Sequence, residues 1–315
     1  VFITSFDRPN IQYRVMTKNS PRDQLVKFLK AEQEGNSGIV YCLSRKSVEE
    51  TAEYLSNLGF KAMPYHAGLD RKIRDINQMR FLREEGVIMV ATIAFGMGID
   101  KPDVRFVAHL DLPRNMESYY QETGRAGRDG LPSIAWMVYD MQDIAQLSRM
   151  VDTSEADENY KRILRHKLNA IVGYCETVKC RRQVILEYFG EKEATPCGNC
   201  DTCLQPVDTI EGTELAQKAL SCVYRTGESF GAGHLIDILR GDETEKVKKF
   251  RHQELKVFGV GKEVSEKQWS SIFRQLTAAG FIKVDIQNFG GIKLTEKSTP
   301  LLKGQLEIEF RKDPE

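Results

Sequence analysis

Short apolar runs alternate with stretches of helical periodicity along the first half of the chain. Val87–Ala91 and Val104–Ala108 are continuous apolar runs of the kind that a strand buried on both faces shows. The other expected strands are Gly38–Leu43, Lys61–Tyr65 and Ser133–Tyr139. One expected helix starts at Ser20-Pro21. Three others are expected over Arg45–Leu58, Asp70–Arg83 and Met141–Met150. Strands that alternate with helices of about 10–15 residues predict an α/β domain, with a parallel sheet covered by helices on both faces.

The overall composition limits the class of protein. Lys+Arg and Asp+Glu are equal at 45 each, so nucleic-acid binding would have to use local basic patches. No apolar run approaches about 18 residues, and we therefore expect no transmembrane helix and no membrane partner. The first residues, VFITSFDRPN, are not a signal peptide and lack an initiator Met, so we expect the chain to be part of a longer protein.

Polar residues follow three of the expected strands. Ser44 and Arg45 come after the first of these strands, His66 after the second and Thr92 after the third. Ligands of parallel sheets bind beyond the carboxyl ends of the strands. Hydroxyls, backbone N–H groups and helix N-termini in such loops bind phosphate. The four residues are therefore candidates to bind phosphate, although His66 could instead be a loop histidine bonded to its own neighbours.

A pair of arginines follows the fourth expected strand. Gln121, Arg125 and Arg128 fall at i, i+4 and i+7, which is one face if Glu117–Arg128 is helical. Two glycines interrupt that helix, each at a cost of about 1 kcal/mol relative to Ala, as happens where a ligand approaches the backbone closely. Guanidinium groups bind phosphate oxygens bidentately and keep their charge. The pair predicts a phosphate site, and the alternative is a surface helix with ordinary salt bridges.

Four cysteines have the spacing of a metal site. They follow the pattern C-x16-C-x2-C-x2-C and are Cys180, Cys197, Cys200 and Cys203. A C-x2-C knuckle presents two thiolates in the geometry of tetrahedral zinc, and four protein ligands make the ion structural. An iron–sulfur cluster is the main alternative, but the C-x3-C-P continuation is missing. Crowded cysteines of this kind indicate metal in a reducing cytosol. Cys42, Cys175 and Cys222 lie on apolar stretches and are expected in the core.

The region around these cysteines is basic. Asp152–Asn159 is an acidic linker, after which Lys and Arg outnumber Glu up to Lys192. Apolar stripes around Ile163–Ile171 and Val184–Phe189 predict two antiparallel helices with a basic outer face. That face is either simply solvated or in contact with a DNA backbone.

The last third of the chain has the pattern of a winged helix. The expected helices are Thr213–Tyr224, Gly231–Arg240 and a third that Ser265 caps in a capping box (S-x-x-Q) and that stops at Gly280. Two strands, Phe281–Val284 and Ile292–Leu294, flank a turn at Asn288–Gly291. In winged helices the third helix commonly enters a DNA groove. Lys267 and Arg274 are its candidate DNA contacts, with Gln268 and Ser271 also facing outward, and Trp269 is expected in the core.

Two strings resemble a known family. QETGRAGRDG, preceded by ATIAFGMGIDKPDVRFVAH, resembles motifs V and VI of RecQ-family helicases. The run YCETVKCRR…YFGE…CGNCDTC resembles the zinc subdomain of the same family and is more specific. The resemblance extends from Phe6 to about Leu302 and covers the second motor lobe, zinc subdomain and winged helix of bacterial members. The sequence holds no phosphate cradle of the form G-x-x-x-x-G-K-[ST] and no acidic metal-binding motif, which in this family lie in the first lobe.

The resemblance implies a function for the intact protein. It would be an ATP-dependent 3′–5′ DNA helicase of DNA repair and recombination in the bacterial cytoplasm, associated with the nucleoid. ATP and Mg²⁺ would bind with the missing first RecA-like lobe. Arg125 and Arg128 would stabilise charge on the γ-phosphate, with Arg128 as the arginine finger, and Gln121 and Arg125 would couple the finger to the DNA loops. Asp100, Gly98 and both arginines would face the nucleotide. The loops would follow the backbone of single-stranded DNA through Ser44, Arg45, His66 and Thr92. The partners would be single-stranded and duplex DNA, the first lobe and a single-stranded-DNA-binding protein.

The same resemblance predicts a domain plan. It comprises a second RecA-like lobe (1–151), a helical zinc-binding subdomain (152–207), a winged-helix domain (208–302) and a charged tail (303–315). Two alternatives differ in function. An RNA helicase of related build is disfavoured by the zinc knuckle and winged helix, whereas a zinc-stabilised DNA-binding regulator without a motor would leave the arginine pair without any ATPase role. By itself this chain is expected not to turn over ATP.

Overall fold

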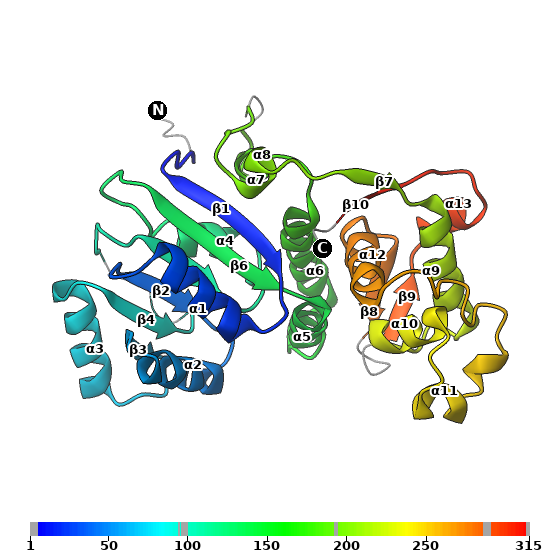
Figure 1. The fold of residues 1–315 in the computed structure, drawn as a ribbon, viewed down its shortest axis with the longest axis horizontal. Coiled ribbons are helices and arrows are strands. Elements are labelled where there is room, and N and C mark those ends of the chain that lie inside the picture. The colour runs from blue at the N-terminus through cyan, green and yellow to red at the C-terminus, as the bar shows by residue number, and fades with distance from the viewer. Residues whose placement is uncertain (1–5, 94, 96–99, 192–194, 286–290, 313–315) are drawn as a thin grey trace. The chain divides into compact units, whose positions relative to one another are not determined.

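The chain forms two compact units. The computed structural model describes residues 6–93, 95, 100–191, 195–285 and 291–312 (Figure 1). The first unit comprises residues 1–140 and 179–205, and the second comprises residues 141–178 and 206–315. The predicted zinc-binding subdomain, residues 152–207, is therefore shared between the two units, because its first helix packs with the winged helix and its cysteine segment packs with the sheet.

The first unit is built on a six-stranded parallel sheet with the order β1-β6-β5-β2-β4-β3. The strands are β1 (Ile11–Thr17), β2 (Gly38–Tyr41), β3 (Lys61–Tyr65), β4 (Val87–Ala91), β5 (Phe106–His109) and β6 (Ser133–Tyr139). The inner strands β2, β4 and β5 are buried at every position, which explains their continuous apolar runs. This confirms the predicted α/β class. The expected strand at Val104–Ala108 begins two residues later than predicted, at Phe106.

β1 was not predicted from the sequence. Ile11 and Tyr13 are buried, while the residues that alternate with them are only partly covered. Such half-buried alternation is the pattern of an edge strand. β1 pairs with β6 along its whole length, from Ile11 opposite Ser133 to Thr17 opposite Tyr139.

Helices cover both faces of the sheet. They are α1 (Pro21–Glu32), α2 (Arg45–Asn57), α3 (Arg71–Arg83) and α4 (Met116–Thr123). α1 and α2 pack on one face, where Phe28 meets Phe106 and Trp136. On the other face α4 places Tyr119 against Tyr13 and His109. Ser44 and Asp70 stand at the N-caps of α2 and α3, and each accepts a hydrogen bond from a backbone N–H of the following first turn.

The cysteine segment also belongs to the first unit. It contains α7 (Arg181–Tyr188) and α8 (Asp201–Leu204). Arg182 Nη2 donates to the carbonyl oxygens of Pro9 and Ile11, at 2.9 and 3.0 Å, and Arg181 Nε lies 2.8 Å from Asp201 Oδ1. Both arginines are buried. The expectation that they contribute to a basic outer face is therefore wrong, because they bind the start of β1 and α8 instead.

The second unit contains the predicted winged helix. Its helices are α5 (Met141–Asp152), α6 (Glu158–Glu176), α9 (Thr213–Arg225), α10 (Ala232–Arg240), α11 (Glu245–Lys249), α12 (Glu266–Ala278) and α13 (Ser298–Leu302). Its strands form two antiparallel pairs, β7 (Thr209–Glu211) with β10 (Glu309–Arg311) and β8 (Ile282–Asp285) with β9 (Gly291–Leu294). The capping box at Ser265 is present, and Trp269 is fully buried with its indole N–H donating to Gly261 O. Asn288–Gly290 lies outside the described residues.

The end of the chain takes part in this fold. The predicted charged tail, from Lys303, contains β10, and Gln275 of α12 binds both the backbone N–H and the carbonyl oxygen of Arg311. α12 is buried along most of its length because α6 packs on the side that the winged-helix core does not cover. Within the described part of the chain, no helix has both the length and the apolarity needed to span a membrane.

Candidate functional sites

The four predicted metal ligands come together. The thiol sulfurs of Cys180, Cys197, Cys200 and Cys203 all lie within 4.8 Å of one another. Cys180 and Cys200 stand at the N-caps of α7 and α8, and Gly198 turns the knuckle with a φ of +65°. No other group of this kind is found among the described residues. Cys42, Cys175 and Cys222 are buried in the core, as predicted.

Backbone N–H groups donate hydrogen bonds to two of the cluster's sulfur atoms. Backbone N–H groups of Arg181 and Cys197 point at the sulfurs of Cys200 and Cys180, at 3.3 and 3.2 Å. Burial raises the pKa of Cys200, but hydrogen bonds from Thr202, Arg181 and Cys203 outweigh it and lower that pKa to about 7. Zinc binds thiolates, so a thiol that ionises readily suits it. Four sulfur ligands leave no open position, and Zn²⁺ held by them would stabilise the fold without taking part in catalysis.

The arginine pair lies on a turn and not on a helix. α4 spans Met116–Thr123, so the helix considered over Glu117–Arg128 is present only as far as Thr123 and does not include the two arginines. Gly127 has a φ of +56°, and a Cβ on it would lie 2.4 Å from Asn10 Nδ2. A glycine is thus required in the turn that follows α4, and the backbone N–H of Gly127 donates to Val104 O, two residues before β5.

Arg128, on this turn, forms an ion pair with Asp100. Arg128 Nη1 lies 2.7 Å from Asp100 Oδ1, and the two side chains are 37% and 83% exposed. Two residues predicted to face the nucleotide are therefore neighbours, although 28 positions separate them in the sequence. Gly98, also predicted to face the nucleotide, lies outside the described residues. Gln121 is exposed on α4, while Arg125 is half-buried close to the hydroxyl of Tyr41.

Two residues without a predicted role hold this turn. Arg8 donates from its guanidinium to the carbonyl oxygens of Gly124 and Ala126, at 2.9 and 2.8 Å. Asn10 Nδ2 donates to the carbonyl oxygens of Gly127 and Leu131, at 2.8 and 3.0 Å. The only hint in the sequence is that both lie in the polar segment FDRPN, whose distant partners no local pattern indicates.

The predicted backbone-contacting loops are adjacent. They follow β2, β3 and β4, which are neighbours in the sheet. Ser44 and Arg45 are exposed at the start of α2, and Thr92 is partly exposed. His66 is buried, with Nε2 3.0 Å from Glu49 Oε1 and Nδ1 accepting from the N–H of Gly68. The His66 side chain is therefore bonded inside the protein, to Glu49 of α2 and to Gly68 of its own loop.

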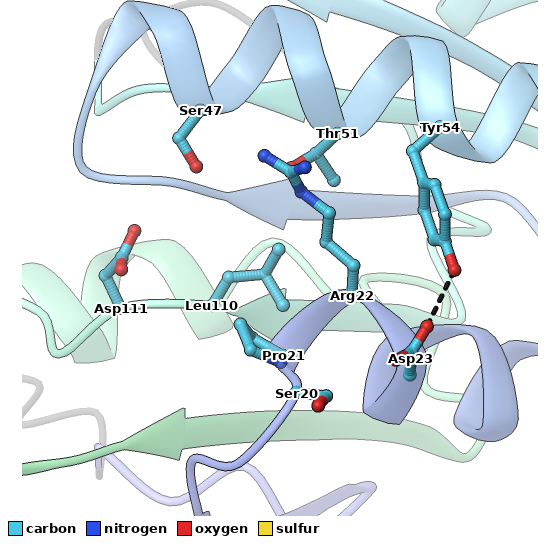
Figure 2. Close-up of a pocket in the computed structure, with 9 residues that line it drawn as sticks. All are labelled: Ser20, Pro21, Arg22, Asp23, Ser47, Thr51, Tyr54, Leu110 and Asp111. Carbon is cyan, nitrogen blue, oxygen red and sulfur yellow. Dashed lines mark hydrogen bonds between the residues drawn. The ribbon is translucent and has the colours of Figure 1, made fainter.

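A pocket of about 410 Å³ opens on the same unit (Figure 2). Tyr54 donates its hydroxyl to Asp23 Oδ1 across 2.7 Å on its rim. Its lining residues are Ser20, Pro21, Arg22, Asp23, Ser47, Thr51, Tyr54, Leu110 and Asp111. None of the residues predicted to bind nucleotide, DNA or metal lines it.

The two predicted DNA contacts on α12 differ in exposure. Lys267 is exposed in the first turn. Arg274 is 2% exposed and forms a buried ion pair with Glu176 of α6. The expectation that Arg274 and Ser271 face outward is wrong, because α6 covers that side of α12.

Comparison with known proteins gives three consecutive matches. A helicase conserved C-terminal domain matches residues 20–130, a RecQ zinc-binding domain matches 141–204, and an RQC domain matches 206–315. The second of these includes all four clustered cysteines, so the cluster is a structural zinc site.

Several relatives match over nearly the whole chain. The ATP-dependent DNA helicase RecQ of Haemophilus influenzae is 47% identical over 310 residues, which are 98% of this chain and 50% of the relative. That of Bacillus subtilis is 37% identical over 97% of this chain and 51% of its own length, and the RecQ-like DNA helicase blm-1 of Caenorhabditis elegans is 34% identical over 97% and 33%. The chain thus spans about half the length of the curated bacterial relatives it matches. The parallel sheet with its arginine turn, the four-cysteine cluster and the winged helix agree with these matches, and the chain belongs to the RecQ family.

Proposed function

We propose that the intact protein is an ATP-dependent 3′–5′ DNA helicase of DNA repair and recombination in the bacterial cytoplasm, associated with the nucleoid. This chain contributes the second RecA-like lobe, the zinc-binding segment and the winged helix, in the domain plan predicted above. The observation that carries the proposal is the exposed pair of Arg128 and Asp100, held on a turn in a chain that lacks a phosphate cradle. Such an arginine acts on a nucleotide only if another lobe supplies the nucleotide.

Arg128 is suited to act as an arginine finger. An ion pair between two solvent-exposed side chains contributes only about 0–1 kcal/mol, so Arg128 exchanges Asp100 for phosphate oxygens at little cost. Its guanidinium, together with that of Arg125, would then stabilise the charge on the γ-phosphate in the transition state. Mg²⁺ and the β- and γ-phosphates of ATP would be held by the first lobe. The turn that Arg8 and Asn10 hold in shape fixes the backbone around the finger.

The loops after β2, β3 and β4 are proposed to follow single-stranded DNA. Ser44, Arg45 and Thr92 present hydroxyl, guanidinium and backbone groups to phosphates, which fix register without reading sequence. The His66 imidazole instead shapes its loop through Glu49 and Gly68. Opening and closing of the lobes around ATP would move these loops along the strand.

The winged helix is proposed to bind duplex DNA. Lys267 is its candidate contact on α12, and exposed Arg162 on α6 belongs to the same unit. A single-stranded-DNA-binding protein is proposed as a further partner. The 315-residue chain alone is proposed to hydrolyse no ATP.

Unwinding by the protein joined to its first lobe tests this function. Two partial duplexes with equal sequences, one with a 3′ and one with a 5′ single-stranded tail, are offered with ATP and Mg²⁺. Strand separation is expected for the 3′-tailed duplex alone, with zinc bound and ATP consumed. Duplex binding without ATP hydrolysis would favour the zinc-stabilised DNA-binding regulator instead.

A further inference from the structure

A line of buried polar contacts joins the arginine turn to a predicted DNA loop. Tyr41, the last residue of β2, donates its hydroxyl to the carbonyl oxygen of Phe95 across 3.1 Å. The N–H of Phe95 in turn donates to Thr92 O across 3.0 Å, which closes the turn that follows β4. Tyr41 is 4% exposed and Phe95 is 1% exposed, so water does not compete for these bonds.

The other side of Tyr41 faces the arginine segment. Its ring stacks on His109, with centroids 5.2 Å apart, and His109 Nε2 lies 2.7 Å from Glu122 Oε2 on α4. Burial raises the pKa of Tyr41, while the nearby Arg125 guanidinium acts in the opposite direction. The hydroxyl therefore stays protonated at neutral pH and remains a donor to Phe95.

We propose that Tyr41 is a positioning residue that couples Arg125 to the loop of Thr92, so that DNA binding and ATP hydrolysis are linked through its hydroxyl. This inference rests on the proposed function, in which Arg125 acts at the nucleotide and Thr92 at the DNA. A path of contacts connects Arg125 to Tyr41 within one unit: the backbone N–H of Arg125 donates to Glu122 O across 3.3 Å, the Glu122 carboxylate pairs with His109, and His109 stacks on Tyr41. Tyr41 then continues to Phe95 and Thr92. When ATP draws Arg125 toward phosphate, the charge beside the Tyr41 hydroxyl changes, and the bond to Phe95 carries that change to the loop.

Tyr41 touches neither nucleotide nor DNA in this scheme. Removal of its hydroxyl should therefore leave each binding site intact and weaken only the link between them. A residue with a purely structural role would instead lower stability and all activities together.

The test uses Tyr41→Phe in the protein joined to its first lobe, with Tyr54→Phe as the matched control. Tyr54 also donates its hydroxyl to one acceptor, Asp23, but lies on α2 away from the path. We expect Tyr41→Phe to keep its DNA-free ATPase rate, its KM for ATP and its affinity for single-stranded DNA. We expect its DNA-stimulated kcat to fall at least tenfold, toward the DNA-free rate, while Tyr54→Phe behaves like the unmodified protein.

Other results would overturn the proposal. Normal DNA stimulation in Tyr41→Phe, or a parallel loss of DNA-free and stimulated rates in a folded protein, would each contradict coupling through this hydroxyl. If Tyr41→Phe does not fold, Tyr41→His provides the second variant: it keeps an aromatic ring at this position, but the shorter side chain places no donor where the Tyr41 hydroxyl meets Phe95 O. Undiminished DNA stimulation there would also contradict the proposal. An unmodified protein without any ATPase would instead overturn the proposed function itself.

Discussion

Arg274 and Glu176 form an ion pair in the interior of the second unit. Arg274 Nε lies 2.9 Å from Glu176 Oε1, and the two side chains are 2% and 3% exposed. Arg311 Nη2 approaches the second carboxylate oxygen of Glu176 at 3.1 Å. One carboxylate thus ties α6 to α12 and to the last strand, β10.

Arg274→Ala should destabilise the second unit. Removal of one partner of a buried ion pair typically costs about 3–5 kcal/mol, and Arg311 still pairs with Glu176, so we expect the lower end of that range. Urea unfolding followed by circular dichroism measures the loss. Lys267→Ala, an exposed substitution on the same helix, should change stability by less than about 0.5 kcal/mol. Equal stability of the two variants would contradict the buried pair.

The zinc cluster should hold about one zinc ion per chain. Elemental analysis of the purified protein measures the ratio, and absorbance in the visible range should be absent. Cys200→Ser should lower the zinc content and the soluble yield, because metal binding at such a site contributes to folding. Cys175→Ser, a buried cysteine outside the cluster, should retain the zinc. A brown protein that contains iron would contradict the assignment.

Arg128→Ala should abolish most ATP hydrolysis in the protein joined to its first lobe. An arginine finger contributes about 10³–10⁵ to turnover and little to ground-state binding. DNA-stimulated ATPase should therefore fall by orders of magnitude, while DNA affinity stays nearly unchanged. Arg105→Ala is a useful comparison, because Arg105 pairs with Asp129 on the same turn but has no predicted nucleotide contact. A normal rate in Arg128→Ala would make Arg125 the next candidate.

Duplex binding by this chain should weaken steeply as salt rises. Contacts to phosphates release counterions, so affinity should fall at least about tenfold between roughly 50 and 200 mM salt. Fluorescence anisotropy with a labelled duplex measures this, and Lys267→Ala should reduce both affinity and the salt slope. Binding that does not change with salt would indicate that these surfaces serve a protein partner.

Acid should destabilise the second unit through a buried histidine pair. His234 Nε2 lies 2.9 Å from His252 Nδ1, and burial lowers the pKa of His234 to about 4. Between about pH 6.5 and 4 the unfolded chain binds more protons than the folded one, so stability falls as pH falls through this window. The loss should be on the order of 2 kcal/mol. Unfolding at pH 7 and 4.5 measures it, and His234→Gln should reduce the difference.

Elements with a local cause were predictable from the sequence. The C-x2-C knuckle, the capping box at Ser265 and the apolar run at Val87–Ala91 each depend on residues close together in the chain, and the structure contains all three. The positions of site residues that depend on distant partners could not be predicted from the sequence. Arg274 carries the charge of a surface residue, and only Glu176, 98 positions away, explains its burial.

The end of α4 also depends on a residue that is distant in the sequence. Helical spacing of Gln121, Arg125 and Arg128 suggested one face, but α4 ends at Thr123, and the N–H of Gly127 in the following turn donates to Val104 O. A pattern of spacing along the chain cannot report a competing hydrogen-bond partner from another strand. The proximity of Arg128 and Asp100 likewise arises from the path of two loops and not from any periodicity.

The division of the chain into units has a consequence for how the protein can be cut. The polypeptide chain passes from one unit to the other near residues 140, 178 and 205. A single proteolytic cut at any of these places leaves both units joined by the remaining covalent connections. A gene shortened near residue 151 encodes a sheet that lacks α7 and α8, and Arg182 is then no longer present to bind the carbonyl groups of Pro9 and Ile11. No single breakpoint in the gene therefore separates the two units.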